Sequence, residues 1–173
     1  MIHLIKNKVF LFGLDNSGKT SIVNAIKKEP EPGKTKPTIA FNINSIILKA
    51  TEFVIWDAPG QVLYRDKWKR GMLEAEILCF ILDTADLERF DEAKEELNKI
   101  LENPENRNLP LVICFHKMDL DDAKKNLPTA RGMFQLPPFD ERKLYKLETS
   151  IYIDETIEAL KDKFIEIIEQ SRW

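Results

Sequence analysis

The sequence is poor in glycine and cysteine and has no long hydrophobic run. Its 173 residues include six glycines and two cysteines. So few cysteines exclude a disulfide framework, and they do not stand at the spacings of zinc ligands. No run approaches the roughly 18 apolar residues of a membrane-spanning helix. With 26 Lys and Arg against 29 Asp and Glu, the chain also lacks the positive excess that drives nucleic-acid binding.

The rest of the composition is that of a soluble globular protein. Apolar residues make up 43% and charged residues 32% of the chain, and the formal net charge is −3. The length predicts one domain over residues 1–173. The first residues lack a secretory signal and a second-position glycine for myristoylation, and the last four are not a prenylation box. We therefore expect a cytoplasmic protein with no intrinsic membrane anchor and no nucleic-acid partner.

Apolar runs of strand length alternate with segments of helical spacing. The runs cover residues 9–14, 43–48, 53–56, 77–82 and 109–115, and a last short one leads into Glu148. Most of them are nearly continuous, which is typical of strands buried on both faces of a parallel sheet. The alternation predicts an α/β fold with a mostly parallel six-stranded sheet and helices on both faces. Residues 127–142 contain three prolines and no clean period, so we expect an irregular connection with at most one short helix.

A phosphate-binding loop follows the first apolar run. Residues 13–20 read Gly-Leu-Asp-Asn-Ser-Gly-Lys-Thr, which satisfies G-x-x-x-x-G-K-[ST] between a strand and a helix. In such a loop backbone N–H groups surround phosphate oxygens, Lys19 reaches the terminal phosphates and the Thr20 hydroxyl ligates Mg²⁺. The candidate nucleotide-binding residues here are Asp15, Asn16, Ser17, Gly18, Lys19, Thr20 and Ser21. Alone, the loop does not separate GTPases from ATPases or nucleotide kinases.

Two further segments carry residues suited to metal binding and hydrolysis. The third apolar run ends at Asp57 and is followed by Gly60 and Gln61. Asp57 can hold Mg²⁺ through water, the Gly60 N–H can contact a γ-phosphate and Gln61 can orient an attacking water. Upstream, Thr38 can offer its hydroxyl to Mg²⁺ and its N–H to the γ-phosphate. We therefore assign Gln61 and Lys19 as catalytic candidates, and Thr20, Thr38 and Asp57 as metal candidates.

The later strand ends carry a candidate base-recognition set. The carboxylate of Asp119 can accept hydrogen bonds from guanine N1–H and its exocyclic amine, which adenine cannot supply. Lys117 can lay its stem over the base, and the Ile151 N–H can meet the guanine O6. The candidates are His116, Lys117, Asp119, Ser150 and Ile151.

In order and spacing, these elements resemble the small GTPases of the Ras superfamily, and within them the Arf family most closely. The resemblance covers nearly the whole chain. It is carried by residues 13–20, 37–42, 56–61, 64–70 and 90–97, whereas residues 116–119 and 149–156 are similar to the Rag GTPases.

The resemblance implies a P-loop NTPase fold and a molecular switch that binds GTP or GDP with Mg²⁺ and hydrolyses GTP slowly. Effectors, GTPase-activating proteins and exchange factors would meet two switch segments, residues 30–40 and 57–71; the oligomeric state stays open. An alternative is a module that holds GTP permanently as a structural cofactor.

The chain departs from the Arf pattern at three positions. His116 replaces the usual Asn, Pro59 replaces a Gly, and Gly71 stands where the third of three surface aromatics would accompany Phe41 and Trp56. Arf proteins carry an N-terminal amphipathic, myristoylated helix before the first strand, and we expect no counterpart of it here because the first apolar run begins so near Met1. We therefore expect partners other than the usual ones of the family.

Overall fold

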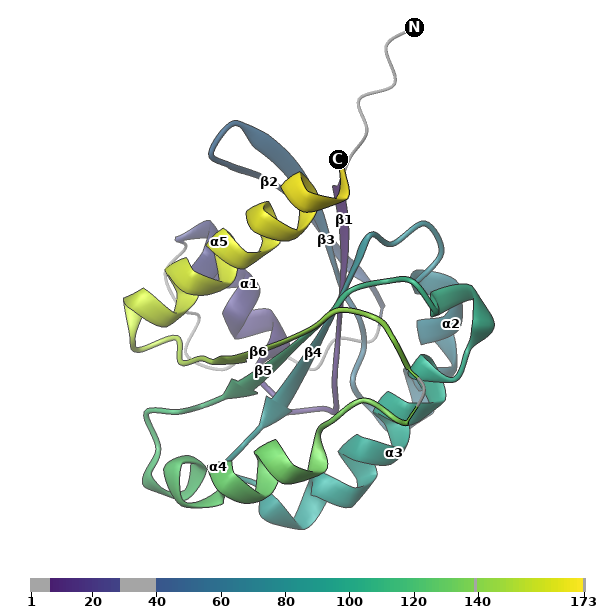
Figure 1. Ribbon diagram of the computed structural model, residues 1–173. Coiled ribbons are helices and arrows are strands. Elements are labelled where there is room, and N and C mark those ends of the chain that lie inside the picture. The colour runs from purple at the N-terminus through teal and green to yellow at the C-terminus, as the bar shows by residue number, and fades with distance from the viewer. Residues whose placement is uncertain (1–6, 29–39, 139, 173) are drawn as a thin grey trace, which may run out of the picture.

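The computed structural model describes residues 7–28, 40–138 and 140–172 of the protein. Its centre is a six-stranded sheet with helices packed on both faces, as Figure 1 shows. The strands are β1 (Asn7–Phe12), β2 (Asn42–Leu48), β3 (Thr51–Asp57), β4 (Ile77–Asp83), β5 (Leu111–His116) and β6 (Leu144–Glu148). The helices are α1 (Lys19–Lys27), α2 (Trp68–Gly71), α3 (Phe90–Leu101), α4 (Asp121–Met133) and α5 (Asp154–Ser171). Short 3₁₀ helices are η1 (Val62–Lys67), η2 (Leu87–Arg89) and η3 (Pro104–Asn106).

The strands lie in the order β2-β3-β1-β4-β5-β6. All neighbours pair in parallel except β2 and β3, which form an antiparallel hairpin. Strands β1, β4 and β5 are almost entirely buried because helices cover both sides of them. The structure thus confirms the predicted fold class, and the predicted runs match the strands to within a few residues at their ends.

Two apolar cores lie on opposite faces of the sheet. One packs α2, α3 and α4 against the sheet, and the other packs α1 and α5. Aromatic rings dominate the first core: the Phe12 ring lies 5.4 Å from that of Phe10, 5.2 Å from that of Phe80 and 5.5 Å from that of Trp68. These contacts fix α2, and hence the segment before it, against the central strands.

Both cysteines lie in the second core. Cys79 on β4 and Cys114 on β5 are completely buried, with their sulfur atoms 3.9 Å apart and no disulfide between them. Burial raises the pKa of the Cys79 thiol well above its usual value. They are therefore inert packing residues, as the apolar runs around them predict.

The prediction of an irregular connection over residues 127–142 is wrong in its first half. Helix α4 continues through Pro128 to Met133. Pro128 removes only one backbone N–H, whose partner would be the carbonyl of Lys124. Both residues are exposed, so that carbonyl lies on the solvent side of the helix where water can reach it, and the buried Ala123 and Ala130 anchor the other side. The proline therefore does not end the helix here.

The carboxyl ends of the five parallel strands meet at one edge of the sheet. In the sheet, β2 and β3 lie on one side of β1, whereas β4, β5 and β6 lie on the other side. The strand order therefore reverses at β1, between β3 and β4. Ligands of open α/β sheets bind at such a reversal of strand order. The candidate residues follow β1, β3, β5 and β6, so the topology brings them to this edge. None of the described helices is long and apolar enough to span a membrane.

Candidate functional site

The loop between β1 and α1 is closed around the side chain of Lys19. The Lys19 ammonium donates hydrogen bonds to the carbonyls of Gly13 and Leu14, at 3.0 and 2.8 Å. Gly18 has a φ of 102°, a conformation that residues with a side chain rarely adopt. Burial lowers the pKa of Lys19 to about 8, although the nearby carboxylates of Asp57 and Asp15 raise it. A buried ammonium at the start of a helix is suited to bind phosphate.

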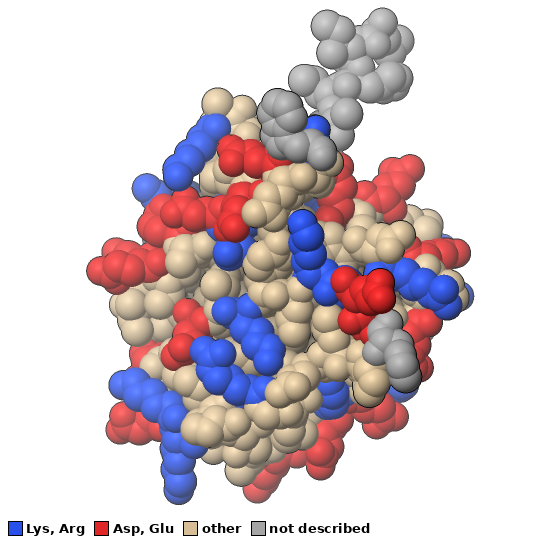
Figure 2. Space-filling model, in the orientation of Figure 1, with Lys and Arg blue, Asp and Glu red and all other residues tan. Residues whose placement is uncertain are grey.

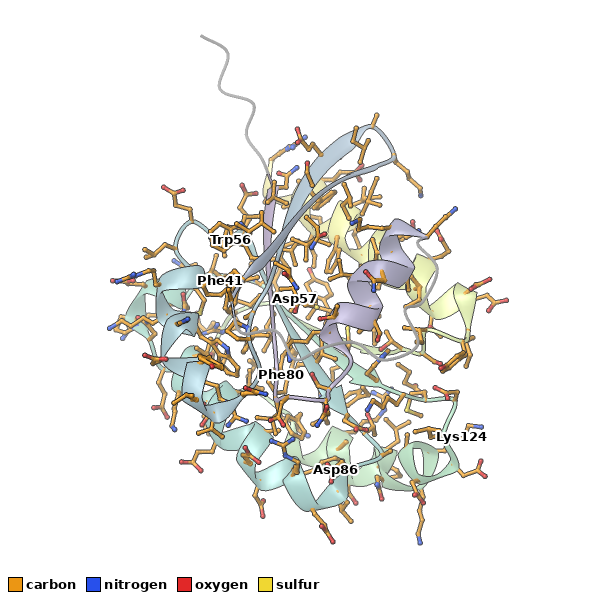
Figure 3. The ribbon with its side chains drawn as sticks, turned by 180° about the vertical axis from the view of Figure 1, so that it is seen from behind. Phe41, Trp56, Asp57, Phe80, Asp86 and Lys124 are labelled. Atoms are coloured by element: carbon orange, nitrogen blue, oxygen red, sulfur yellow. The ribbon has the colours of Figure 1, made fainter. Side chains whose placement is uncertain are left out.

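Asp57, at the end of β3, faces the first turn of α1 (Figure 3). Its Oδ2 accepts a hydrogen bond of 2.8 Å from the Thr20 hydroxyl, while its Oδ1 is buried with no hydrogen-bond partner among the described residues. Burial raises the pKa of Asp57, and the Thr20 hydroxyl and the charge of Lys19 oppose that rise. Mg²⁺ prefers one or two protein oxygens together with phosphates and water. Thr20 and Asp57 therefore fit a Mg²⁺ ion.

Gly60 lies directly over the phosphate loop. Its carbonyl accepts a hydrogen bond of 3.0 Å from the Asp15 N–H. A Cβ atom at position 60 would come within 2.5 Å of the Asp15 nitrogen and 2.6 Å of the Lys19 ammonium, so only glycine fits here. Gln61 follows at once, half-buried, and precedes η1. The backbone brings Gly60 and Gln61 to the mouth of the loop that holds Lys19.

Two arginines clamp the carboxylate of Asp15. Its Oδ1 lies 2.8 Å from Nη2 of Arg89 and 3.3 Å from Nη2 of Arg65, and Arg89 also donates to the Asp15 carbonyl. Burial alone would raise the pKa of Asp15, but the hydrogen bond and charge of Arg89 and the charge of Arg65 lower it. The negative charge of Asp15 is therefore shared with two guanidinium groups.

The guanidinium of Arg65 joins η1 to α3. Only 6% of its side chain is exposed. Its Nε donates to the Gly60 carbonyl at 2.8 Å, Nη2 lies 2.9 Å from Glu92 and Nη1 lies 3.7 Å from Glu96. The sequence alone assigns no role to Arg65, which lies in the Arf-like segment 64–70, or to Arg89, because each sits in a segment dense with charges. Their burial among carboxylates is visible only in the fold.

His116 links the end of β5 to the phosphate loop. Its Nδ1 lies 2.8 Å from the Thr149 hydroxyl, and its ring packs so closely on Gly18 that a Cβ there would come within 2.6 Å of Cδ2. Burial and the charge of Lys117 lower the pKa of His116 to about 4, against a smaller effect of Asp119. The imidazole is therefore neutral at physiological pH.

The other base-recognition candidates are tied to one another and to the phosphate loop. The Lys117 ammonium donates to the Asn16 carbonyl and to Asp83, both at 2.8 Å. Asp119 accepts a hydrogen bond of 2.7 Å from the Ser150 hydroxyl. Asp83 and His116 are paired positions of β4 and β5. Three separate strand ends thus form one continuous polar surface with the phosphate loop.

The remaining candidates are distributed as follows. Ser17 is buried within the loop, and its hydroxyl lies 3.3 Å from the Lys19 ammonium. Ser21 and Ile151 line a cavity of about 640 Å³ between α1 and the start of α5. Thr38 lies outside the described residues. Apart from Thr38, the predicted site residues gather at the same edge of the sheet. No group of three or more His, Cys, Asp or Glu side chains in the described part of the chain could hold a metal alone.

Phe41 and Trp56 lie beside one another next to the site, as Figure 3 shows. Their ring centroids are 5.4 Å apart, and both side chains are half-buried against the first core. Gly71 makes room for the Phe41 ring, which would collide with a Cβ atom at that position. The ammonium of Lys8 lies 3.7 Å from the centre of the Trp56 ring and donates to the Leu73 carbonyl. This aromatic pair is thus packed inward, and a lysine covers part of it.

The face seen in Figure 2 carries basic and acidic side chains interspersed with one another. Elsewhere in the described structure Arg131 and Glu148 form an exposed pair at 2.8 Å, and Lys163 and Glu166 form a half-buried one at 2.7 Å. Such pairs contribute little to stability.

Comparisons with known proteins agree with this geometry. Residues 3–168 match the model of the ADP-ribosylation factor (Arf) family. ADP-ribosylation factor-like protein 6 of Danio rerio is 38% identical over 118 residues, which are 66% of this chain and 63% of that protein. The aligned part thus spans less than two thirds of that relative.

A solved structure extends the likeness over nearly the whole fold. It is the Arl6 (BBS3) small GTPase from Trypanosoma brucei with the bound nucleotide analogue GppNp. The TM-score is 0.79 at 19% identity, over 95% of this chain and 98% of that one. Because the family model matches almost the entire sequence, the chain belongs to the ADP-ribosylation factor family of small GTPases.

Proposed function

We propose that this protein is a guanine-nucleotide switch that binds GTP and GDP with Mg²⁺ and slowly hydrolyses GTP. The observation that supports this best is the convergence of three parts at one sheet edge. These are the phosphate loop with Lys19, the pair Asp57 and Gly60, and the loops carrying His116 and Asp119. In this role residues 1–173 would form a single GTP-binding domain that acts in the cytoplasm.

Phosphate binding is assigned to residues 15–21. Lys19 already points its ammonium at the backbone of the loop, so it needs little reorganisation to meet the β- and γ-phosphates. Thr20 and Asp57 would hold Mg²⁺, the latter through water, and Thr38 would complete the set in the GTP state. When bound, Mg²⁺ neutralises charge that develops on the phosphates. The Gly60 N–H would contact the γ-phosphate.

Hydrolysis is assigned to Gln61, which orients the attacking water, and to Lys19, which stabilises the transition-state charge. Arg65 and Arg89 are engaged by Asp15 and by glutamates of α3, so neither is offered to the γ-phosphate. Without an arginine at that position we expect turnover on the order of 10⁻³ s⁻¹ or less. An activating protein that supplies an arginine would accelerate it by roughly 10³–10⁵.

Base selection is assigned to the loops after β5 and β6. Asp119 would accept two hydrogen bonds from guanine, and the Ile151 N–H would meet O6. Ser150 holds the Asp119 carboxylate by a hydrogen bond, and Lys117 links the base loop to Asn16 of the phosphate loop. His116 would occupy the space between the base and Gly18. Effectors, activating proteins and exchange factors would bind residues 30–40 and 57–71.

One observation favours a second candidate, a module that holds GTP without cycling. Pro59 is buried and its carbonyl accepts a hydrogen bond of 2.7 Å from the Trp68 indole, which restrains the segment before Gln61. A restrained segment around Pro59 would change little in conformation when the γ-phosphate is lost, so GTP hydrolysis would not switch the partner surface.

Single-turnover hydrolysis of bound GTP separates the two candidates. We expect wild-type protein to convert GTP to GDP slowly, faster in the presence of a cell extract that supplies an activating protein, and Gln61→Leu to lose both rates. Equal rates in the two proteins under both conditions would favour the static module. Competition binding with GTP, GDP and ATP tests the base assignment, since ATP binding as tight as that of GTP contradicts a role for Asp119.

A further inference from the structure

The carbonyl of Gly60 is held from two sides. The Asp15 N–H approaches it from the phosphate loop at 3.0 Å, and Nε of Arg65 approaches it from η1 at 2.8 Å. This oxygen belongs to the peptide that joins Gly60 to Gln61. A peptide unit is planar, so fixing its oxygen also fixes the plane from which Gln61 extends. Arg65 therefore restrains the backbone at Gly60, which is assigned to the γ-phosphate, and at Gln61, which is assigned to the attacking water.

The other end of the Arg65 guanidinium is fixed as well. Nη2 contacts Glu92 and Asp15, and Nη1 lies near Glu96. Arg89 contacts the same two carboxylates, Asp15 and Glu92. The hydrogen bond from Arg89, with a smaller contribution from Arg65, lowers the pKa of Glu92 against the effect of its burial. Asp15 and Glu92 therefore stay ionised, and their contacts with the planar fork of Arg65 oppose its rotation away from Gly60.

We propose that Arg65 is a positioning residue for GTP hydrolysis. It sets the orientation of the peptide between Gly60 and Gln61 by bridging that peptide to the phosphate loop and to α3. The inference rests on the proposed function, because it assigns how the γ-phosphate contact and the attacking water are held. Arg65 touches neither nucleotide nor water in this assignment, and acts through Gly60.

Arg89 offers an internal comparison. It shares Asp15 and Glu92 with Arg65 and carries the same charge, yet its hydrogen bonds go to Asp15 and Glu92 and not to Gly60. Any loss that comes only from weakening the ionic cluster should appear in variants of either arginine. A loss that comes from misplacing Gly60 and Gln61 should appear in variants of Arg65 alone.

The test measures single-turnover hydrolysis of bound GTP, together with GDP and GppNp affinity, in Arg65→Lys, Arg89→Lys and Arg70→Lys. Lysine keeps the charge but lacks the planar fork in which Nε of Arg65 meets the Gly60 carbonyl while Nη2 meets Glu92. Arg70 is exposed on α2, so its variant is a matched control in the same segment. We expect Arg65→Lys to hydrolyse GTP about 10- to 100-fold more slowly, because small misplacements of reacting groups cost that much.

In the same variant, GDP affinity should stay within about twofold of wild type while the preference for GppNp over GDP falls, a split that general destabilisation does not produce. Arg89→Lys should lose less than about threefold in rate, and Arg70→Lys should match wild type. If Arg65→Lys fails to bind GDP, the test uses Glu92→Gln, which removes the charge that holds Nη2 of Arg65. We then expect the hydrolysis rate to fall about threefold or more, because the Arg65 guanidinium is less firmly held against Gly60.

Two results would overturn the positioning role in a wild-type protein that hydrolyses GTP. One is a hydrolysis rate of Arg65→Lys within about threefold of the wild-type rate, and the other is an equal loss of rate in Arg65→Lys and Arg89→Lys. An unchanged rate in Glu92→Gln does the same where that variant is needed. Absence of GTP hydrolysis in the wild-type protein overturns the proposed function, and this inference with it, so the two failures are told apart by the wild-type measurement.

Discussion

Replacing His116 by Asn should remove a specific sensitivity of the fold to acid. His116 is buried, with Nδ1 2.8 Å from the Thr149 hydroxyl and the ring against Gly18. Its pKa is lowered from 6.5 to about 4, chiefly by burial and then by the charge of Lys117. An asparagine can still hydrogen-bond to Thr149, but it does not titrate.

The sign of the effect follows from which state binds the proton. Between pH 6.5 and pH 4 the unfolded chain protonates His116 while the folded protein keeps it neutral. Protons therefore favour unfolding in this window, and the stability that is fully present above pH 6.5 is lost as the pH falls toward 4. With these two pKa values the loss between pH 7.5 and pH 5 is about 2 kcal/mol.

The assay is urea unfolding of nucleotide-free wild type and His116→Asn at pH 7.5, 6 and 5, chosen to sample the window. The difference between the proteins isolates His116, because all carboxylates and His3, which lies outside the described residues, are common to both. We expect the variant to gain about 2 kcal/mol relative to wild type on going from pH 7.5 to pH 5. A difference that stays constant to within about 0.5 kcal/mol would show that His116 is not held neutral by its surroundings.

Two further predictions concern Lys19 and Gly71. Since burial lowers the pKa of Lys19 to about 8, about three quarters of the Lys19 side chains are deprotonated at pH 8.5 and almost none at pH 6.5. Bound phosphate favours the ammonium form, so on GDP binding Lys19 should take up as much as about 0.8 proton at pH 8.5 and contribute none at pH 6.5, which calorimetry in buffers of different ionisation enthalpy measures. Equal proton uptake at the two pH values contradicts the reasoning. Gly71→Ala should destabilise by about 1–3 kcal/mol in urea unfolding, because its Cβ would meet the Phe41 ring and lie 2.8 Å from that of Phe10. Gly132→Ala, where nothing lies within 4 Å, is the control and should be neutral or stabilising.

Much of the fold was predictable because the central strands are buried on both faces. Continuous apolar runs identified β4 and β5 without help from any motif. The prediction for residues 127–133 was wrong because proline usually breaks a helix, and the sequence alone offered no reason to expect Pro128 inside α4. Whether a proline ends a helix depends on whether water reaches the freed carbonyl, and this is a property of the tertiary structure.

The site residues with a motif were predictable, whereas those that support them were not. The spacing of the loop at 13–20 and of the segment at 57–61 carries its own chemistry. Arg65 contacts Asp15 across 50 residues and Arg89 contacts it across 74 residues, so no local pattern links them. The inward packing of Phe41 likewise depends on Gly71, which the sequence marks only as a missing aromatic.

The two buried thiols allow unfolding to be followed by chemical labelling without an added probe. Cys79 and Cys114 are its only cysteines and sit on adjacent central strands, where a thiol reagent cannot reach them in the folded state. Fraying of helix ends or movement of the loop edge leaves them covered, so their labelling rate follows opening of the sheet itself. Nucleotide that binds only the folded state should slow this reaction by the factor 1 + [L]/Kd, where [L] is the free nucleotide concentration, so simple thiol labelling measures ligand affinity.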